Sequence, residues 1–128
     1  YTNPKHTPEE RAEKWLEISK RFEVETDYSG LNPDIKRFAW HRQLHIFEVP
    51  FYYIEYAIAQ LGALQFYKMY KGDPAKAVGN YLNALTLGGS RAPQELFEAA
   101  GIKMDFSFDM LSSLMEMVEE EINELEKD

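Results

Sequence analysis

Two histidines lie four residues apart in the sequence His41-Arg42-Gln43-Leu44-His45. On a helix this spacing places both imidazoles on one face, where they could bind one metal ion. However, Arg42 stands where the HExxH pattern of zinc sites has its general-base glutamate, and only Glu48 and Glu55 lie nearby as further ligands. Three interpretations stay open: a metal site, ordinary core or interface histidines, or a histidine that hydrogen-bonds a substrate.

An aromatic run follows closely, in the sequence Phe51-Tyr52-Tyr53-Ile54-Glu55-Tyr56. On a helix Tyr53 and Tyr56 share one face, and Tyr52 shares an adjacent face with Tyr56. Phenol O–H groups can donate hydrogen bonds to a developing oxyanion, so the run is a candidate catalytic or substrate-binding surface. The alternative is a tyrosine stripe that only packs in the core, with Glu55 as a buried acid satisfied by a partner.

The sequence Gly88-Gly89-Ser90 is a weak match to a phosphate-binding loop. It follows a predicted helix rather than a strand and lacks the P-loop lysine, so it indicates the end of a helix. No Ser/His/Asp order and no paired carboxylates of catalytic spacing stand out along the chain. The histidines and tyrosines between positions 41 and 56 therefore remain the candidates for chemistry.

Helix signals cover most of the chain and position these residues. Thr7-Pro8-Glu9-Glu10 is a capping box, Asp73-Pro74 is an N-cap followed by proline, and Ser107 or Asp105 can cap the last helix. Apolar spacing predicts a short helical piece at 34–40 and helices over 8–22, 50–72, 74–87, 93–100 and 108–127, with Gly72 and Gly101 placed to end two of them. The prediction is an all-α bundle of about five helices, with residues 1–128 forming a single helical segment.

The composition fits a helical domain and argues against several classes of function. The 128 residues are 45% hydrophobic and contain no cysteine, which excludes thiolate chemistry and fits a reducing, cytoplasmic location. The net charge is −8, and the acidic residues gather after position 115, where the last helix should fray or meet a basic neighbour. Without a basic stripe, nucleic acid and an anionic membrane are not expected partners. Polar residues inside 51–70 also argue against a membrane span.

The sequence resembles the oligoendopeptidase F branch of the thimet oligopeptidase family, which are zinc metallopeptidases. The resemblance covers most of residues 38–125 and rests on His45-x-x-x-x-Pro50-Phe51-Tyr52-Tyr53-Ile54-Glu55-Tyr56-Ala57-Ile58-Ala59-Gln60-Leu61, Ala84-Leu85-x-Leu87-Gly88-Gly89-Ser90 and Pro93-x-Glu95-Leu96-Phe97-x-x-Ala100-Gly101. It implies the C-terminal part of a larger, mostly helical zincin-type metalloendopeptidase that hydrolyses short peptides. Such enzymes hold zinc on an HExxH helix, and a zinc-bound water is the nucleophile.

The resemblance implies site residues in this chain but no zinc ligand, because HExxH does not occur in it. His45 would hydrogen-bond the substrate backbone, and Tyr53 and Tyr56 would donate to the oxyanion as the family's Tyr-x-x-Tyr pair. Tyr52 is a rival for that role, because the spacing from the histidine varies within the family. The chain alone is then expected to be inactive and to need the zinc-binding segment, which carries HExxH, as its partner.

Two other functions stay open from the sequence. A non-catalytic helical binding or assembly module would keep the family's helices without its chemistry. A stand-alone metal protein would use His41 and His45, and it predicts stoichiometric zinc in the purified chain. Helix faces left without their partners also predict self-association of the isolated chain.

Overall fold

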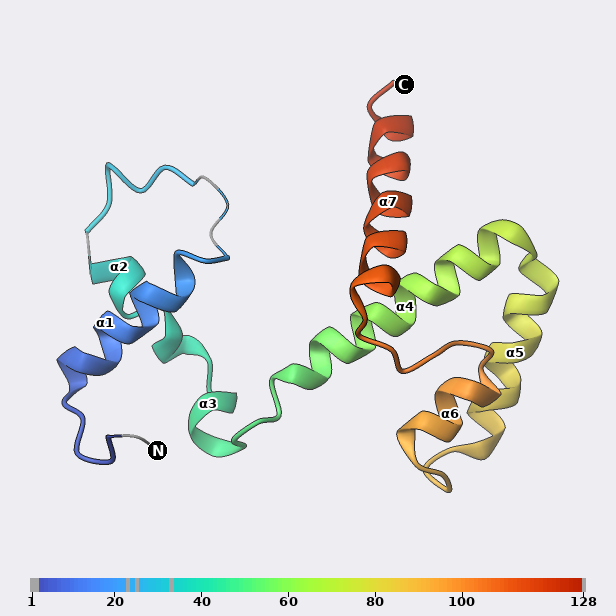
Figure 1. Cartoon of the computed structure of the whole chain (residues 1–128), viewed down its shortest axis with the longest axis horizontal. Helices are drawn as coiled ribbons and strands as arrows, with labels where there is room; N and C mark the ends of the chain where they lie inside the picture. The colour runs from blue at the N-terminus through green and yellow to red at the C-terminus, as the bar shows by residue number, and fades with distance from the viewer. Residues whose placement is uncertain (1–2, 23, 25, 33, 128) are drawn as a thin grey trace. The chain divides into compact units, whose positions relative to one another are not determined.

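The chain is built from helices throughout the part that the structure describes. The computed structural model describes residues 3–22, 24, 26–32 and 34–127. Its elements are α1 (Pro8–Ser19), α2 (Asp34–Arg37), the 3₁₀ helix η1 (Ala39–Arg42), α3 (His45–Glu48), α4 (Ile54–Gly72), α5 (Pro74–Leu87), α6 (Pro93–Ala99) and α7 (Phe108–Leu125) (Figure 1). Since no strand occurs among these residues, the predicted all-α class is confirmed. The chain forms two compact units, Tyr1–Tyr52 and Tyr53–Asp128, and the single segment expected over 1–128 stays a prediction.

The local signals at the helix ends act as the sequence predicts. Thr7, Asp73 and Ser107 each accept a hydrogen bond from the backbone N–H three residues later, at 3.2, 3.0 and 3.3 Å. These bonds satisfy donors that the first turn of a helix leaves without partners. Gly88 follows α5 with φ of 52°, which confirms the helix-end interpretation, and Gly101 follows α6 with φ of 72°. These angles lie in the left-handed region that favours glycine.

The predicted end of the first helix is wrong. α1 ends at Ser19 and not at Phe22, and a turn with i to i−3 backbone bonds follows it. Phe22 is 78% exposed, so no packing extends the helix to it. α4 ends at Gly72, as the sequence predicted. Gly72 is however the last residue of the helix and not its C′ cap, because Asp73 is both the C-cap of α4 and the N-cap of α5.

The first unit is held by α1 packing on α2, with few fully buried side chains. Ala12, in α1, is completely buried. Its small side chain lets the backbones approach, and the Trp15 indole Nε1–H donates to the Lys36 carbonyl at 3.1 Å. Further along the chain the rings of Trp40 and Phe47 stack, with their centroids 5.4 Å apart. This unit therefore has a thin core of aromatic contacts around one helix.

The second unit is organised around α4, which contacts α5 and α7, while α5 contacts α6 (Figure 1). Its buried apolar side chains are Ala77, Ala100, Ile102, Leu114 and Met117. Gly62 is buried in α4 against the Phe97 ring. A Cβ at this position would lie only 3.3 Å from that ring, so a larger residue would crowd the contact. The Gln65 side chain fixes the segment between α6 and α7, since Nε2 donates to the Lys103 carbonyl at 2.8 Å and Oε1 accepts its N–H at 2.9 Å.

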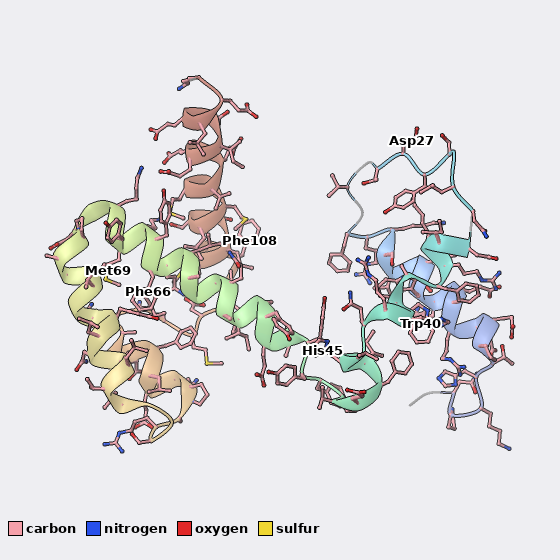
Figure 2. The ribbon with its side chains drawn as sticks, turned by 180° about the vertical axis from the view of Figure 1, so that it is seen from behind. Asp27, Trp40, His45, Phe66, Met69 and Phe108 are labelled. Carbon is pink, nitrogen blue, oxygen red and sulfur yellow. The ribbon has the colours of Figure 1, made fainter. Side chains whose placement is uncertain are left out.

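Polar contacts tie α7 to α4 at two heights. The Lys68 Nζ donates to the Ser113 carbonyl at 3.2 Å. Nearer the end of α7, Glu121 accepts a hydrogen bond from the Tyr67 hydroxyl at 2.7 Å and pairs with the Lys71 Nζ at 2.6 Å. The acidic end of the last helix therefore has the basic neighbour that the sequence predicted as one of two outcomes. Figure 2 shows Phe66 and Met69 on α4, whose partners Tyr81 and Asn80 belong to α5.

Within the described residues, no helix is both long and apolar enough to cross a membrane.

Candidate functional site

His45 and Tyr52 form an aromatic pair at the end of the first unit. His45 is the first residue of α3 and is half-buried, and its position is labelled in Figure 2. The rings of His45 and Tyr52 lie parallel within 4°, with their centroids 5.8 Å apart. Stacking of this kind restricts the orientation of the imidazole, which a substrate-binding histidine requires.

A tight turn brings Tyr52 back to His45. The Tyr52 N–H donates to the Val49 carbonyl at 3.1 Å, with Pro50 and Phe51 between them. Proline suits the second position of a turn, and the third position takes a positive φ in type II turns. Phe51 has φ of 67° at this third position, a backbone conformation that is unfavourable for a residue with a side chain. Its ring is 82% exposed, so its own packing does not hold this conformation.

This turn shows that the helix predicted from Pro50 begins later, at Ile54. The left-handed φ of Phe51 cannot belong to a right-handed helix, and Tyr53 serves as the N-cap. The prediction that Tyr52 and Tyr56 share a helix face is therefore wrong, because Tyr52 lies before the helix. The spacing rule failed because proline and the turn after it interrupted the helical period.

Tyr53 and Tyr56 form a second aromatic pair, at the start of the second unit. Their ring centroids lie 5.5 Å apart with the ring planes inclined by 60°. The two tyrosines are 50% and 52% exposed, so their hydroxyls are not sealed in a core. Each unit therefore holds one of the two aromatic pairs. The contact between Tyr53 and Tyr56 agrees with the sequence prediction that these two residues share one helix face.

Glu55, which was expected to be a buried acid, is exposed on the first turn of α4. An exposed carboxylate needs no protein partner, because water solvates it. The stripe of α4 that carries the tyrosines is exposed along the whole helix, at Tyr53, Tyr56, Gln60, Ala63, Tyr67 and Tyr70. Three- and four-residue steps join these positions, so they share one face, and the packed residues occupy the opposite one.

The histidine pair does not form the two-ligand helix face that its spacing suggested. His41 lies in η1, whose C-cap is Gln43, whereas His45 begins α3. The His41 ring instead contacts Trp40, with centroids 4.2 Å apart, and Phe38, with centroids 5.2 Å apart. Across the described residues no group of three or more His, Asp or Glu side chains could hold a metal ion. The described residues therefore hold no ligand set of the size that a zinc centre requires.

Three perturbed pKa values belong to the contact between α4 and α7, those of Glu121, Lys71 and Tyr67. The hydrogen bond from Lys71 is the main cause that lowers the pKa of Glu121. The same carboxylate raises the pKa of Lys71 and that of Tyr67, in both cases mainly through its hydrogen bond. The acidic run after position 115 was the signal for this cluster, although the sequence did not identify its partners.

The comparisons with known proteins point to one family. Residues 1–116 match the model of peptidase family M3. A 3.1 Å X-ray structure of a protein provisionally assigned as an oligoendopeptidase F is similar, with 36% sequence identity and a TM-score of 0.86. The match covers 96% of this chain and 22% of that chain, so the chain spans about a fifth of the length of the structure it matches. No curated protein matches it significantly.

Proposed function

The chain belongs to peptidase family M3, and from that premise we propose that it is the C-terminal catalytic-domain segment of a zinc metalloendopeptidase that hydrolyses short peptides. The similarity to an oligoendopeptidase F structure more than four times longer supports this proposal, because the chain covers 22% of it. The observation that carries the proposal is the half-exposed Tyr53–Tyr56 pair at the start of α4, in the part of the chain that matches the family.

In this proposal Tyr53 and Tyr56 donate hydrogen bonds to the oxyanion that develops on the scissile carbonyl. Donors held in place before the reaction cost no reorganisation when the charge appears, and this effect is often the largest in catalysis. Tyr53 lies at the N-cap position of α4 and Tyr56 lies about one turn later, so the start of one helix presents both phenols. His45 binds the substrate backbone, and Tyr52, stacked on it, is the rival donor.

The zinc of the complete enzyme is held, in this proposal, by residues outside this chain. No cluster of metal ligands occurs among the described residues, so the chain's own side chains only bind and orient the peptide. The partners are therefore an oligopeptide substrate and the zinc-binding segment that carries HExxH. The isolated chain is inactive, and a cytoplasmic location is part of the same proposal because the sequence has no cysteine.

The test compares three tyrosine-to-phenylalanine variants in the longer enzyme. Tyr53→Phe and Tyr56→Phe each remove one hydroxyl, and the loss of one such donor should lower kcat by roughly 10²–10³-fold. Tyr28→Phe, in the first unit, is the matched control and should keep kcat within a factor of about two, because the ring that Lys36 contacts remains and Tyr28 is not one of the proposed donors. Zinc content, measured by atomic absorption, should stay the same in all three.

Full activity in both Tyr53→Phe and Tyr56→Phe would contradict the assigned roles. A selective loss in Tyr52→Phe would transfer the donor role to the residue that stacks on His45. A longer protein that has no peptidase activity would instead favour the helical binding or assembly module.

A further inference from the structure

An apolar groove runs between α4 and α5 in the second unit. We call it the α4–α5 groove and define it by Ala63, Tyr67 and Tyr70 of α4 and Ala77, Val78 and Tyr81 of α5. Its volume is about 400 Å³, and none of its lining residues is charged. The two alanines leave the space open between the larger side chains. On the α4 side, Phe66 packs edge-on against Tyr81 with a centroid distance of 5.5 Å, which fixes one wall.

The groove leaves several apolar and aromatic side chains half-exposed to water. Tyr70, Val78 and Tyr81 are 49%, 49% and 51% exposed. Apolar side chains that gather in an uncharged groove are a feature of interaction surfaces. The same face of α4 carries Tyr53 and Tyr56 closer to its N-terminus, so the groove continues the exposed stripe of the candidate site.

The total surface of the chain indicates how much is left uncovered. The accessible surface is 10491 Å². Two separate compact bodies with the sizes of the two units would expose about 8,500 Å² together, from the scaling of surface with mass. The excess of about 2,000 Å² on one side of an interface is the size found for obligate contacts, not for transient ones. The exposed apolar side chains that contribute to this excess lie in both units, and those of the α4–α5 groove are among them.

We propose that the α4–α5 groove is the surface on which a helix from the rest of the peptidase chain docks through its apolar face. This inference rests on the proposed function, because it requires the longer enzyme. The chain spans 22% of the structure that it matches, so most of such an enzyme lies outside these 128 residues. A lining without charge fits an apolar helix face, which needs no ion pair.

A bound peptide substrate fits the groove less well than a helix does. An extended peptide brings a backbone N–H and a C=O group at every residue, and each needs a partner when it is buried. The polar groups of the lining are the hydroxyls of Tyr67, Tyr70 and Tyr81, and the Tyr67 hydroxyl already donates to Glu121. A helix satisfies its own backbone groups and presents only side chains. Docking there would also hold α4, and with it the Tyr53–Tyr56 pair, against the zinc-binding part.

The experiment measures thiol labelling in the longer enzyme without substrate. Val78→Cys and Ala63→Cys place one thiol on each side of the groove, and Glu120→Cys, on the exposed acidic face of α7, is the control. Each labelling rate is divided by the rate of the same variant in denaturant, with the labelled peptide identified by mass spectrometry. Protection of about 100-fold or more is expected at positions 78 and 63, because a covered thiol reacts only when the structure opens locally. Position 120 should label almost as fast as in the denatured enzyme.

Three outcomes would overturn the docking proposal. Rates at positions 78 and 63 that equal the rate at position 120 would show an uncovered groove. Protection that appears only when a peptide is added would make the groove a substrate subsite. Protection that disappears on dilution, together with dissociation in sedimentation, would identify a second copy of the chain as the occupant. Peptidase activity of the unsubstituted enzyme reports separately on the proposed function, so an active enzyme with an unprotected groove refutes only the docking.

Discussion

Two glycine-to-alanine substitutions in the second unit should have opposite effects on stability. Gly101 has φ of 72°, and a Cβ built there would lie only 2.3 Å from the Asn80 Nδ2. Gly79 lies in the middle of α5, and a Cβ there meets no heavy atom within 4 Å. The same added methyl group therefore meets a strained, crowded site in one variant and open space on a helix in the other.

The magnitudes follow from these two environments. An alanine in the left-handed region costs about 1–2 kcal/mol. In Gly101→Ala the Asn80 side chain must also move, which breaks its 3.4 Å contact with the Met69 sulfur. We therefore expect Gly101→Ala to destabilise the unit by about 2–3 kcal/mol. In Gly79→Ala the gain in helix propensity should stabilise α5 by about 0.8–1 kcal/mol.

Hydrogen exchange, resolved to peptides of α5 and α6, measures both effects as local opening free energies. Each 1.4 kcal/mol corresponds to a tenfold change, so exchange should be about 30-fold faster or more in Gly101→Ala and about fivefold slower in Gly79→Ala. The measurement works on the chain itself and within the longer enzyme. Equal exchange in Gly101→Ala and the unsubstituted protein would refute the conformation assigned to the turn after α6.

Two further predictions concern α7. Leu114 is 1% exposed and Leu125 is 74% exposed. Leu114→Ala should therefore lower the free energy of unfolding by about 3 kcal/mol, and Leu125→Ala by less than about 0.5 kcal/mol. Equal losses of the two variants in urea unfolding would contradict the assigned core. The contact of Glu121 with Tyr67 and Lys71 should also make the attachment of α7 depend on pH. The pKa of Glu121 lies below its ordinary 4.5, so this contribution is present above pH 4.5 and is lost as the pH falls through the lowered value. The pKa values of Tyr67 and Lys71 are raised above their ordinary values of 10.0 and 10.5. The stability contribution of the contact is therefore fully present below pH 10.0, and it is lost as the pH rises through the raised pKa values. Glu121→Gln should reduce the acid limb of a circular dichroism titration, to which Asp105 with its own lowered pKa also contributes, and an unchanged limb would show that Glu121 has no part in it.

The helices could be predicted from the sequence because their signals are local. Thr7, Asp73 and Ser107 each act on a backbone N–H three residues away, so their capping role needs no tertiary contact. The apolar spacing of α5 and α7 likewise appears within one helix. The two misplaced helix boundaries show the limit of this reasoning. The end of α1 and the start of α4 depend on packing and on the conformation of a turn, which propensity alone does not determine.

The candidate site could be predicted only in part. The sequence identified His45, Tyr52, Tyr53 and Tyr56 as the residues for chemistry, and their roles stay a prediction. It did not show that Tyr52 pairs with His45 while Tyr53 pairs with Tyr56. Tyr52 comes directly after the turn at Phe51, whose positive φ is unusual for a side chain larger than glycine.

The sequence by itself determined the all-α class, the five longer helices and the family resemblance, because each depends on residues that are neighbours in the chain. The tertiary structure alone decided which faces are covered and which are left open. Gln65 holds the backbone of a residue 38 positions later, and Tyr67 reaches a carboxylate 54 positions later. No periodicity encodes such pairs, since they form only when α4 and α7 meet. The α4–α5 groove exists for the same reason: two helices with small residues at facing positions pack and leave an apolar surface for a third.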